Sequence, residues 1–168
     1  MKRYLFCFIL LYSVFLYSQD VVKFMGIATN LRYAQFVEEL SKKVKVNEEE
    51  KVWTTFRGDF AGLGICDITV TNAGTYEVDK IIVTKKYVQL NQISEIVELY
   101  SRKYGEPTEF TLGGTREYRF KYHAASICIS VIDNTYYPAF LYGGVGNTLQ
   151  IWYQPNIYRE KKITTEDI

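Results

Sequence analysis

The stretch ICDITVTN at residues 65–72 and the stretch ICISVIDN at residues 127–134 place a cysteine at the same position of a similar pattern. In the first, apolar residues recur at every second position, which is typical of a β-strand with one packed face. Around Cys128 the pattern leaves open which residues face the core. Each stretch follows an aromatic segment with the same alternation, FRGDF at residues 56–60 and YRFKY at residues 118–122. The sequence therefore predicts a β-hairpin in each half of the chain.

A helical pattern precedes each hairpin. The segments FVEELSKK at residues 36–43 and IVELYSRK at residues 96–103 carry apolar residues three or four positions apart, which is the period of an amphipathic helix. This spacing predicts helices over residues 31–44 and 92–104. The expected capping residues are Thr29 or Asn30 for the first helix and Asn91 for the second, with Gly105 and Pro107 ending the second.

The same order of helix and strands thus occurs twice. A third strand is expected in each half, around residues 78–84 and 149–153. Short antiparallel strands with one wet face need a layer of helices on the other face. We therefore expect an α+β fold of two tandem helix-plus-antiparallel-hairpin repeats, with the helices packed on one face of the sheet. The predicted repeats span residues 19–88 and 89–158.

The two halves differ in two places. Residues 105–115, with the sequence GEPTEFTLGGT, are rich in Gly, Pro and Thr and predict a linker between the repeats. Residues 134–147, with the sequence NTYYPAFLYGGVGN, replace the short turn that follows the equivalent strand of the first half. Residues 159–168 are mostly charged, and this pattern predicts a frayed tail.

The first segment is expected to be a secretory signal peptide over residues 1–18. The positive pair at residues 2–3 precedes the uncharged run YLFCFILLYSVFLY at residues 4–17. This run is shorter than the roughly 20 residues that cross a bilayer and has the length of a signal-peptide core. Cleavage is expected between Ser18 and Gln19, and the mature chain is then periplasmic or secreted, with no transmembrane segment. An uncleaved anchor is the alternative.

The composition indicates a folded protein and argues against a nucleic-acid partner. The chain has 168 residues, with 20 Lys and Arg against 19 Asp and Glu, so it lacks the strong positive field of nucleic-acid-binding proteins. Hydrophobic residues make up 48% of the chain, as in globular proteins and unlike disordered ones. Its unusual feature is the content of 15 Tyr, 10 Phe and 2 Trp. We expect a folded domain with many aromatic rings and no nucleic-acid partner.

The sequence contains no recognisable set of catalytic or metal-binding residues. His123 is the only histidine, and the chain has no G-x-S-x-G pattern of the kind that a serine hydrolase uses. A single histidine and two cysteines a whole repeat apart do not match the ligand spacing of zinc sites. The neighbouring Glu38 and Glu39 are expected on a solvated helix face, not in the cleft that glycosidases need. The prediction is a protein that is not an enzyme and has no cofactor or metal.

Cys66 and Cys128 are the two cysteines of the expected mature chain. Export to an oxidising compartment allows a disulfide between them, provided that their Cα atoms lie about 4.4–6.8 Å apart. The alternative is that both are buried small hydrophobic residues, as free cysteines often are.

The segment at residues 134–147 is the candidate contact surface. Aromatic side chains bury a large area at a small entropic cost, which makes them frequent anchors of interfaces. The alternative is that these rings fold back onto the sheet or onto the second helix. The candidate partner-binding residues are Tyr136, Tyr137, Phe140, Leu141 and Tyr142.

These features predict an exported, non-catalytic binding module, inhibitor-like in kind, that contacts a protein partner through residues 134–147. The alternative is a carrier of a small apolar or carbohydrate ligand, held in an aromatic-lined pocket between the sheet and this segment. A closed pocket of several hundred Å³ beneath the segment favours the carrier. A convex aromatic segment without such a pocket favours the binding module.

Several short motifs together resemble a known family. They are KFMGI at residues 23–27, FRGDFAG at 56–62, CDITV at 66–70 and KYGEP at 103–107. In this combination the chain resembles a family of small exported Bacteroidetes proteins of unknown function. Its repeat architecture is also similar to the folds of the beta-lactamase inhibitor protein and of outer-membrane assembly lipoproteins. The resemblance implies export and assigns no activity, because a fold does not determine a function.

Overall fold

The computed structural model describes residues 21–122, 125–136 and 146–155. A short hairpin comes first, made of β1 (Lys23–Phe24) and β2 (Ile27–Ala28). The first half of the chain continues with α2 (Tyr33–Ser41), β3 (Lys45–Glu49), β4 (Trp53–Asp59), β5 (Ile65–Thr71) and β6 (Lys80–Val88). The second half contains α3 (Leu90–Tyr104), β7 (Thr108–Leu112), β8 (Thr115–Tyr122), β9 (Ala125–Asp133), the 3-10 helix η1 (Asn134–Tyr136) and β10 (Asn147–Pro155).

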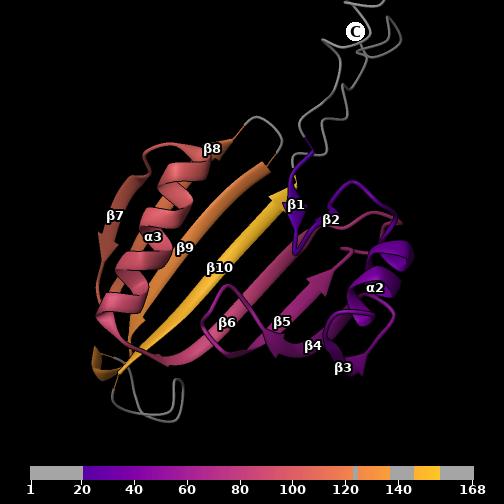
Figure 1. The fold of residues 1–168 in the computed structure, drawn as a ribbon, viewed down its shortest axis with the longest axis horizontal. Coiled ribbons are helices and arrows are strands. Elements are labelled where there is room, and N and C mark those ends of the chain that lie inside the picture. The colour runs from indigo at the N-terminus through magenta and orange to yellow at the C-terminus, as the bar shows by residue number, and fades with distance from the viewer. Residues whose placement is uncertain (1–20, 123–124, 137–145, 156–168) are drawn as a thin grey trace, which may run out of the picture.

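The eight longer strands form one antiparallel sheet in the order β3-β4-β5-β6-β10-β9-β8-β7 (Figure 1). The two halves of the chain meet where β6 pairs with β10, so that Ile81 lies opposite Tyr153 and Val83 opposite Ile151. Without this pairing, β6 and β10 would each leave a row of backbone N–H and C=O groups unpaired at the middle of the sheet. The pairing satisfies these groups in both strands.

This arrangement corrects the expected fold class. The expectation of two tandem helix-plus-antiparallel-hairpin repeats is wrong, because the described strands form one eight-stranded sheet and one two-stranded sheet, with two helices in the same residues. Local alternation identifies single strands but carries no information about which distant strand lies beside them. The antiparallel direction of the strands is confirmed.

Two strands of the sheet are missing from the elements expected from the sequence. These are β3 and β7, and the predicted linker at residues 105–115 contains all of β7. All five side chains of each strand are exposed. Since a strand is recognised in a sequence by the alternation of a buried and a wet face, an edge strand that buries neither face leaves no such pattern.

The two helices cover one face of the sheet, and both lie in front of it in Figure 1. Phe36 and Leu40 of α2 are fully buried, and Ile93 and Ile96 of α3 are nearly so. They form one hydrophobic core with the alternate strand residues that face them. The two central strands contribute Ile81 and Val83 of β6 and Leu149, Ile151 and Tyr153 of β10. The other face carries no helix in the described part of the chain, and we call it the helix-free face.

Aromatic rings connect the two helices across the covered face. Phe24 of β1 is at the centre of this group, and its ring centroid lies 6.4 Å from that of Phe36 in α2 and 5.4 Å from that of Phe60. Its centroid is also 5.2 Å from that of Tyr153 in β10, which contacts Tyr100 of α3 at 6.1 Å. Figure 1 shows the β1–β2 hairpin between α2 and α3. Many of the rings that enrich the sequence therefore build the core.

The helix starts differ from those expected. Thr29, an expected cap of the first helix, instead donates its hydroxyl to a backbone carbonyl seven residues earlier. The second helix begins after Gln89, not after Asn91, and the backbone N–H of Gln89 donates to Oε1 of Gln92 at 3.2 Å in a capping box. The predicted end of the second helix at Gly105 is confirmed, where a φ of 87° stops the helix.

None of the described helices is long and apolar enough to cross a membrane. The expected signal peptide at residues 1–18, its cleavage between Ser18 and Gln19, and the charged tail at residues 159–168 lie outside the described residues.

Candidate functional site

The segment at residues 134–147 leaves the sheet from a closed base. Asn134 is buried, and its backbone N–H donates to the carbonyl of Gly146 at 2.9 Å. Its Oδ1 accepts a hydrogen bond of 2.9 Å from the hydroxyl of Thr148. The carboxylate of Asp133 accepts hydrogen bonds from both the backbone and the hydroxyl of Thr135. The contacts of Asn134 with Gly146 and Thr148 join the two described ends of the segment.

Of the predicted partner-binding residues, Tyr136 is the one within the described part of the chain. Its side chain is 66% exposed. It lies directly against Gly114 in the β7–β8 turn, where a Cβ atom on Gly114 would collide with the tyrosine ring. Tyr137, Phe140, Leu141 and Tyr142 lie outside the described residues.

Exposed apolar side chains lie along the end of the sheet from which this segment leaves. Of the ten large hydrophobic residues that are exposed in the described part of the chain, five lie at strand or helix ends on this side. We call these five residues the loop-end surface: Ile65, Tyr87, Leu90, Leu112 and Tyr136. Tyr87 and Tyr136 adjoin the two ends of the segment, and exposed apolar residues beside one another mark interaction sites more often than single ones do.

Tyr87 of the loop-end surface has an unusual backbone. Its φ is 60°, in the left-handed region that residues other than glycine rarely adopt. The strand register of β10 against β6 shifts at this point, because one extra residue of β6 lies between the partners of Asn147 and Leu149. Such a bulge redirects a side chain out of the regular pleat. The Tyr87 ring lies beside Gly146, at the base of the 134–147 segment.

Sequence reasoning identified Tyr136 but missed the other four members of the loop-end surface. Nothing in the local pattern separates an exposed Leu90 or Leu112 from a residue of a buried stripe. The residues reach one end of the sheet only through the antiparallel strand order, which places the ends of β6, β7 and β9 on the same side as the starts of β5 and β10.

The helix-free face carries two aromatic residues that stack with cations. Nζ of Lys80 lies 5.3 Å from the ring centroid of Trp152, and the guanidinium of Arg119 lies 4.4 Å from that of Phe110. Arg119 also donates hydrogen bonds to the carboxylate of Glu117, which raises the pKa of the guanidinium. Nε1 of Trp152 is buried and has no hydrogen-bond partner among the described residues.

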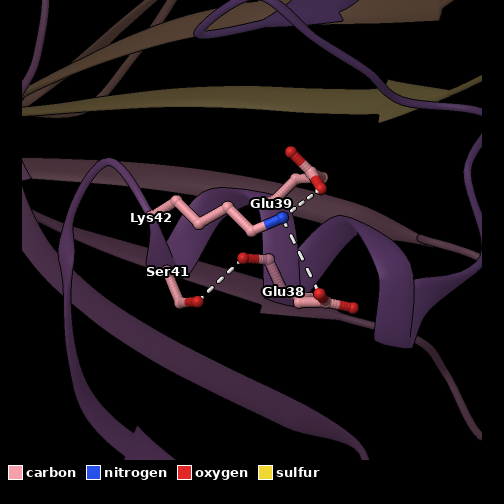
Figure 2. Close-up of polar contacts among 4 residues, drawn as sticks. All are labelled: Glu38, Glu39, Ser41 and Lys42. Atoms are coloured by element: carbon pink, nitrogen blue, oxygen red, sulfur yellow. Dashed lines mark hydrogen bonds and ion pairs between the residues drawn. The ribbon is translucent and has the colours of Figure 1, made fainter.

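The paired carboxylates of α2 are surface groups. Nζ of Lys42 lies 2.5 Å from Oε1 of Glu39 and 3.7 Å from Oε1 of Glu38, and both carboxylates are on the same helix (Figure 2). The hydroxyl of Ser41 donates to the backbone carbonyl of Glu38 at 2.8 Å. The hydrogen bond with Glu39 raises the pKa of the Lys42 ammonium, which is fully exposed. Glu38 and Glu39 therefore form exposed ion pairs along a helix and do not line a cleft.

The two cysteines are free and far apart in the sheet. Cys66 lies on β5 and Cys128 on β9, and β6 and β10 run between these strands. Since neighbouring strands are about 4.8 Å apart, three strand spacings separate the two thiols, beyond the reach of a disulfide. Burial raises the pKa of each thiol to about 11. Thiolate, the nucleophilic form, is therefore scarce at neutral pH.

We expect both thiols to react slowly with iodoacetamide while the protein is folded. At pH 8 a thiol with a pKa near 11 holds roughly a hundredfold less thiolate than a free cysteine, so alkylation slows by about that factor. The rate is expected to climb toward pH 11, and 8 M urea provides the fast control. The unfolded thiol ionises first, so the folded state loses stability as the pH rises through this interval. Rapid alkylation of the folded protein at pH 8 would contradict this assignment.

An open pocket of about 320 Å³ lies elsewhere on the molecule, between the β4–β5 turn and α3. Ala61 and Leu63 of the turn line one side, and Gln92, Ile96 and Arg102 of the helix line the other. Among the residues that the structure describes, no Tyr or Trp side chain lines this pocket. It therefore does not match the aromatic-lined pocket that a small-ligand carrier requires.

Two further sequence features concern histidine and metal chemistry. His123 lies outside the described residues. Within the ranges that the structure describes, no group of three or more His, Cys, Asp or Glu side chains is placed to hold a metal ion. No known protein family, curated protein or solved structure matches this chain, so its functional assignment depends on its own residues and geometry.

Proposed function

We propose that this protein is an exported, non-catalytic binding module that contacts a protein partner through the loop-end surface and the adjoining segment at residues 134–147. The observation that carries the proposal is that half of the large hydrophobic residues exposed within the described ranges lie at the end of the sheet where this segment begins and ends. Export is supported by the positive pair at residues 2–3 and the uncharged run that follows it.

The backbone at the base of the 134–147 segment favours binding because it is ordered before a partner binds. The base of the segment is closed by the hydrogen bonds of Asn134, and Tyr136 rests on Gly114. A surface that is already ordered loses little conformational entropy on association. The left-handed backbone of Tyr87 adds to this argument, since residues in strained conformations are found preferentially at functional sites.

The chemistry of the surface favours a protein over a small molecule. Its residues belong to several strand ends and a helix start along one end of the sheet, and they are exposed rather than folded around a cavity. Small ligands are held in concave sites that bury most of their surface. Exposed Tyr and Leu side chains along an edge are suited to a partner that brings its own complementary surface.

The experiment compares the proteins retained from envelope and culture-supernatant extracts of the source organism by three purified baits. They are the wild type, the variant Leu90→Ser/Tyr136→Ser/Tyr142→Ser, and the control Val52→Ser/Tyr76→Ser. The control removes exposed apolar groups from the opposite end of the sheet. Circular dichroism and thermal melts first establish that all three are folded. We expect one partner that the wild type and the control retain at equal levels and the loop-end variant retains at least tenfold less.

The proposal fails if all three baits retain the same proteins in the same amounts. It fails equally if the control loses the partner as completely as the loop-end variant does. A titration of the purified partner against the three baits by isothermal calorimetry then measures the dissociation constants directly.

A further inference from the structure

The two outer edges of the eight-stranded sheet are built differently. Edge strand β3 carries the charged residues Lys45, Glu48 and Glu49, and its register against β4 shifts between Val46 and Glu48. Charges and bulges are the usual means by which a sheet edge rejects another strand. Edge strand β7 has no bulge and fewer charges. It pairs with β8 over five consecutive residues without a shift and has one charged residue, Glu109.

The outer edge of β7 has backbone N–H and C=O groups that can form hydrogen bonds with another strand. In an antiparallel ladder, alternate residues of an edge strand direct their N–H and C=O groups away from the sheet. Among the described strands, none pairs with β7 on the side away from β8. All five of its residues are exposed, including Phe110 at 46% and Leu112 at 86%. This edge therefore lacks the protection that β3 has.

We propose that β7 pairs antiparallel with β7 of a second copy of this chain, across a two-fold axis perpendicular to the sheet. The two sheets then continue into one another, and the helix-free faces of both copies lie on the same side. This inference does not depend on the proposed binding partner, because it uses the outer backbone edge of β7, which shares only Leu112 with the loop-end surface.

The sequence of β7 is complementary to itself in one register. When Phe110 lies opposite the partner's Phe110, all five residues of the strand are paired. Glu109 then faces the partner's Thr111, and Thr108 faces the partner's Leu112. Aromatic pairs across strands are favourable, and no like charges meet. A register centred on Glu109 would place two carboxylates opposite each other, and one centred on Thr111 would shorten the pairing.

The difference between the two edges also determines the kind of assembly. A contact between β7 of one copy and β3 of the next would be head-to-tail and could extend without limit. The bulge and the three charges of β3 oppose that contact. Pairing of β7 with itself uses the same patch on both copies, and it closes at a dimer.

The interface is small, so the dimer is expected to be weak. Stable dimers bury about 1,200–2,000 Å² or more, and two five-residue strands contribute only part of such an area. Sedimentation velocity over concentrations from low micromolar to about a millimolar should therefore show a reversible exchange between monomer and dimer in the wild-type protein.

The register is tested by placing opposite charges at one exposed position. Thr111→Lys puts an ammonium opposite Glu109 of the partner subunit, twice in each dimer, and is expected to lower the dissociation constant roughly fivefold. Thr111→Glu puts a carboxylate opposite Glu109 of the partner subunit and is expected to raise the dissociation constant by a similar factor. Within one chain Thr111 lies opposite Arg116 of β8, so the effects of these variants on monomer stability have the reverse sign. A change in folding thus cannot imitate the expected result.

The control is Glu48→Lys on β3, which alters charge at the other edge and should leave the dissociation constant unchanged. The proposal is overturned if the wild type remains a monomer throughout the concentration range, which would leave β7 to a strand from another protein. It is also overturned if the wild type dimerises but the two Thr111 variants shift the constant in the same direction, or if the Glu48→Lys variant shifts it as much as they do.

Discussion

Replacing Phe24 with alanine is expected to lower the free energy of unfolding by about 3–5 kcal/mol, the usual cost of removing a fully buried phenylalanine ring. Phe24 is 1% exposed, and its ring contacts those of Phe36, Phe60 and Tyr153. It therefore joins α2 and the end of β4 to the central strand β10. The loss is a large part of the roughly 5–15 kcal/mol that stabilises a typical domain.

Urea denaturation followed by circular dichroism and by tryptophan fluorescence measures this loss. Phe110→Ala is the matched control, because it removes the same ring from the exposed edge strand β7. We expect that control to cost less than about 1 kcal/mol. Equal losses at Phe24 and Phe110 would show that the β1–β2 hairpin does not take part in the core.

The second large effect is expected at the buried pair of hydroxyls that joins α3 to β10. The hydroxyls of Tyr100 and Tyr153 are hydrogen-bonded to each other, and both residues are buried. Burial raises the pKa of Tyr153 above its usual value, so the phenol stays neutral. Tyr100→Phe or Tyr153→Phe leaves one buried hydroxyl without its partner, at a cost of about 1–3 kcal/mol.

A double-mutant cycle tests this pair. The variant Tyr100→Phe/Tyr153→Phe removes both hydroxyls together and leaves no orphaned group, so we expect it to recover most of the stability lost in either single variant. Additive losses would contradict a direct hydrogen bond between the two residues. The variant Tyr76→Phe, at a side chain that is 88% exposed, serves as a control for the loss of a tyrosine hydroxyl at the surface.

The predictable part of the fold is the part with a one-sided burial pattern. Residues 56–60 and 118–122 alternate between core and solvent, and the strands β4 and β8 lie where that pattern predicts them. The two helices were placed to within a few residues, because their apolar residues fall on single faces. The edge strands β3 and β7 bury no face, so their positions were not visible in the pattern.

The pairing of β6 with β10 could not be predicted for a different reason. It joins strands from opposite halves of the chain, and each strand has the same local pattern whichever neighbour it takes. The candidate site could not be predicted in full for the same reason, because it also depends on the sheet order. Tyr136 is predicted from its aromatic surroundings, whereas Leu90 and Leu112 belong to the loop-end surface only because the sheet order places them at the same end of the sheet.

The position of β10 at the middle of the sheet also sets the order in which the molecule can be completed. β10 is the last described strand along the chain, yet it lies between β6 and β9 and supplies the pairing edge for both. During synthesis, the first half therefore keeps the β6 edge open until the residues of β10 have emerged. Contacts between such distant segments form slowly, and open strand edges invite aggregation meanwhile. A chain that stops before residue 147 would keep two unpaired inner edges, which makes the unfinished form a natural client for chaperones and proteases.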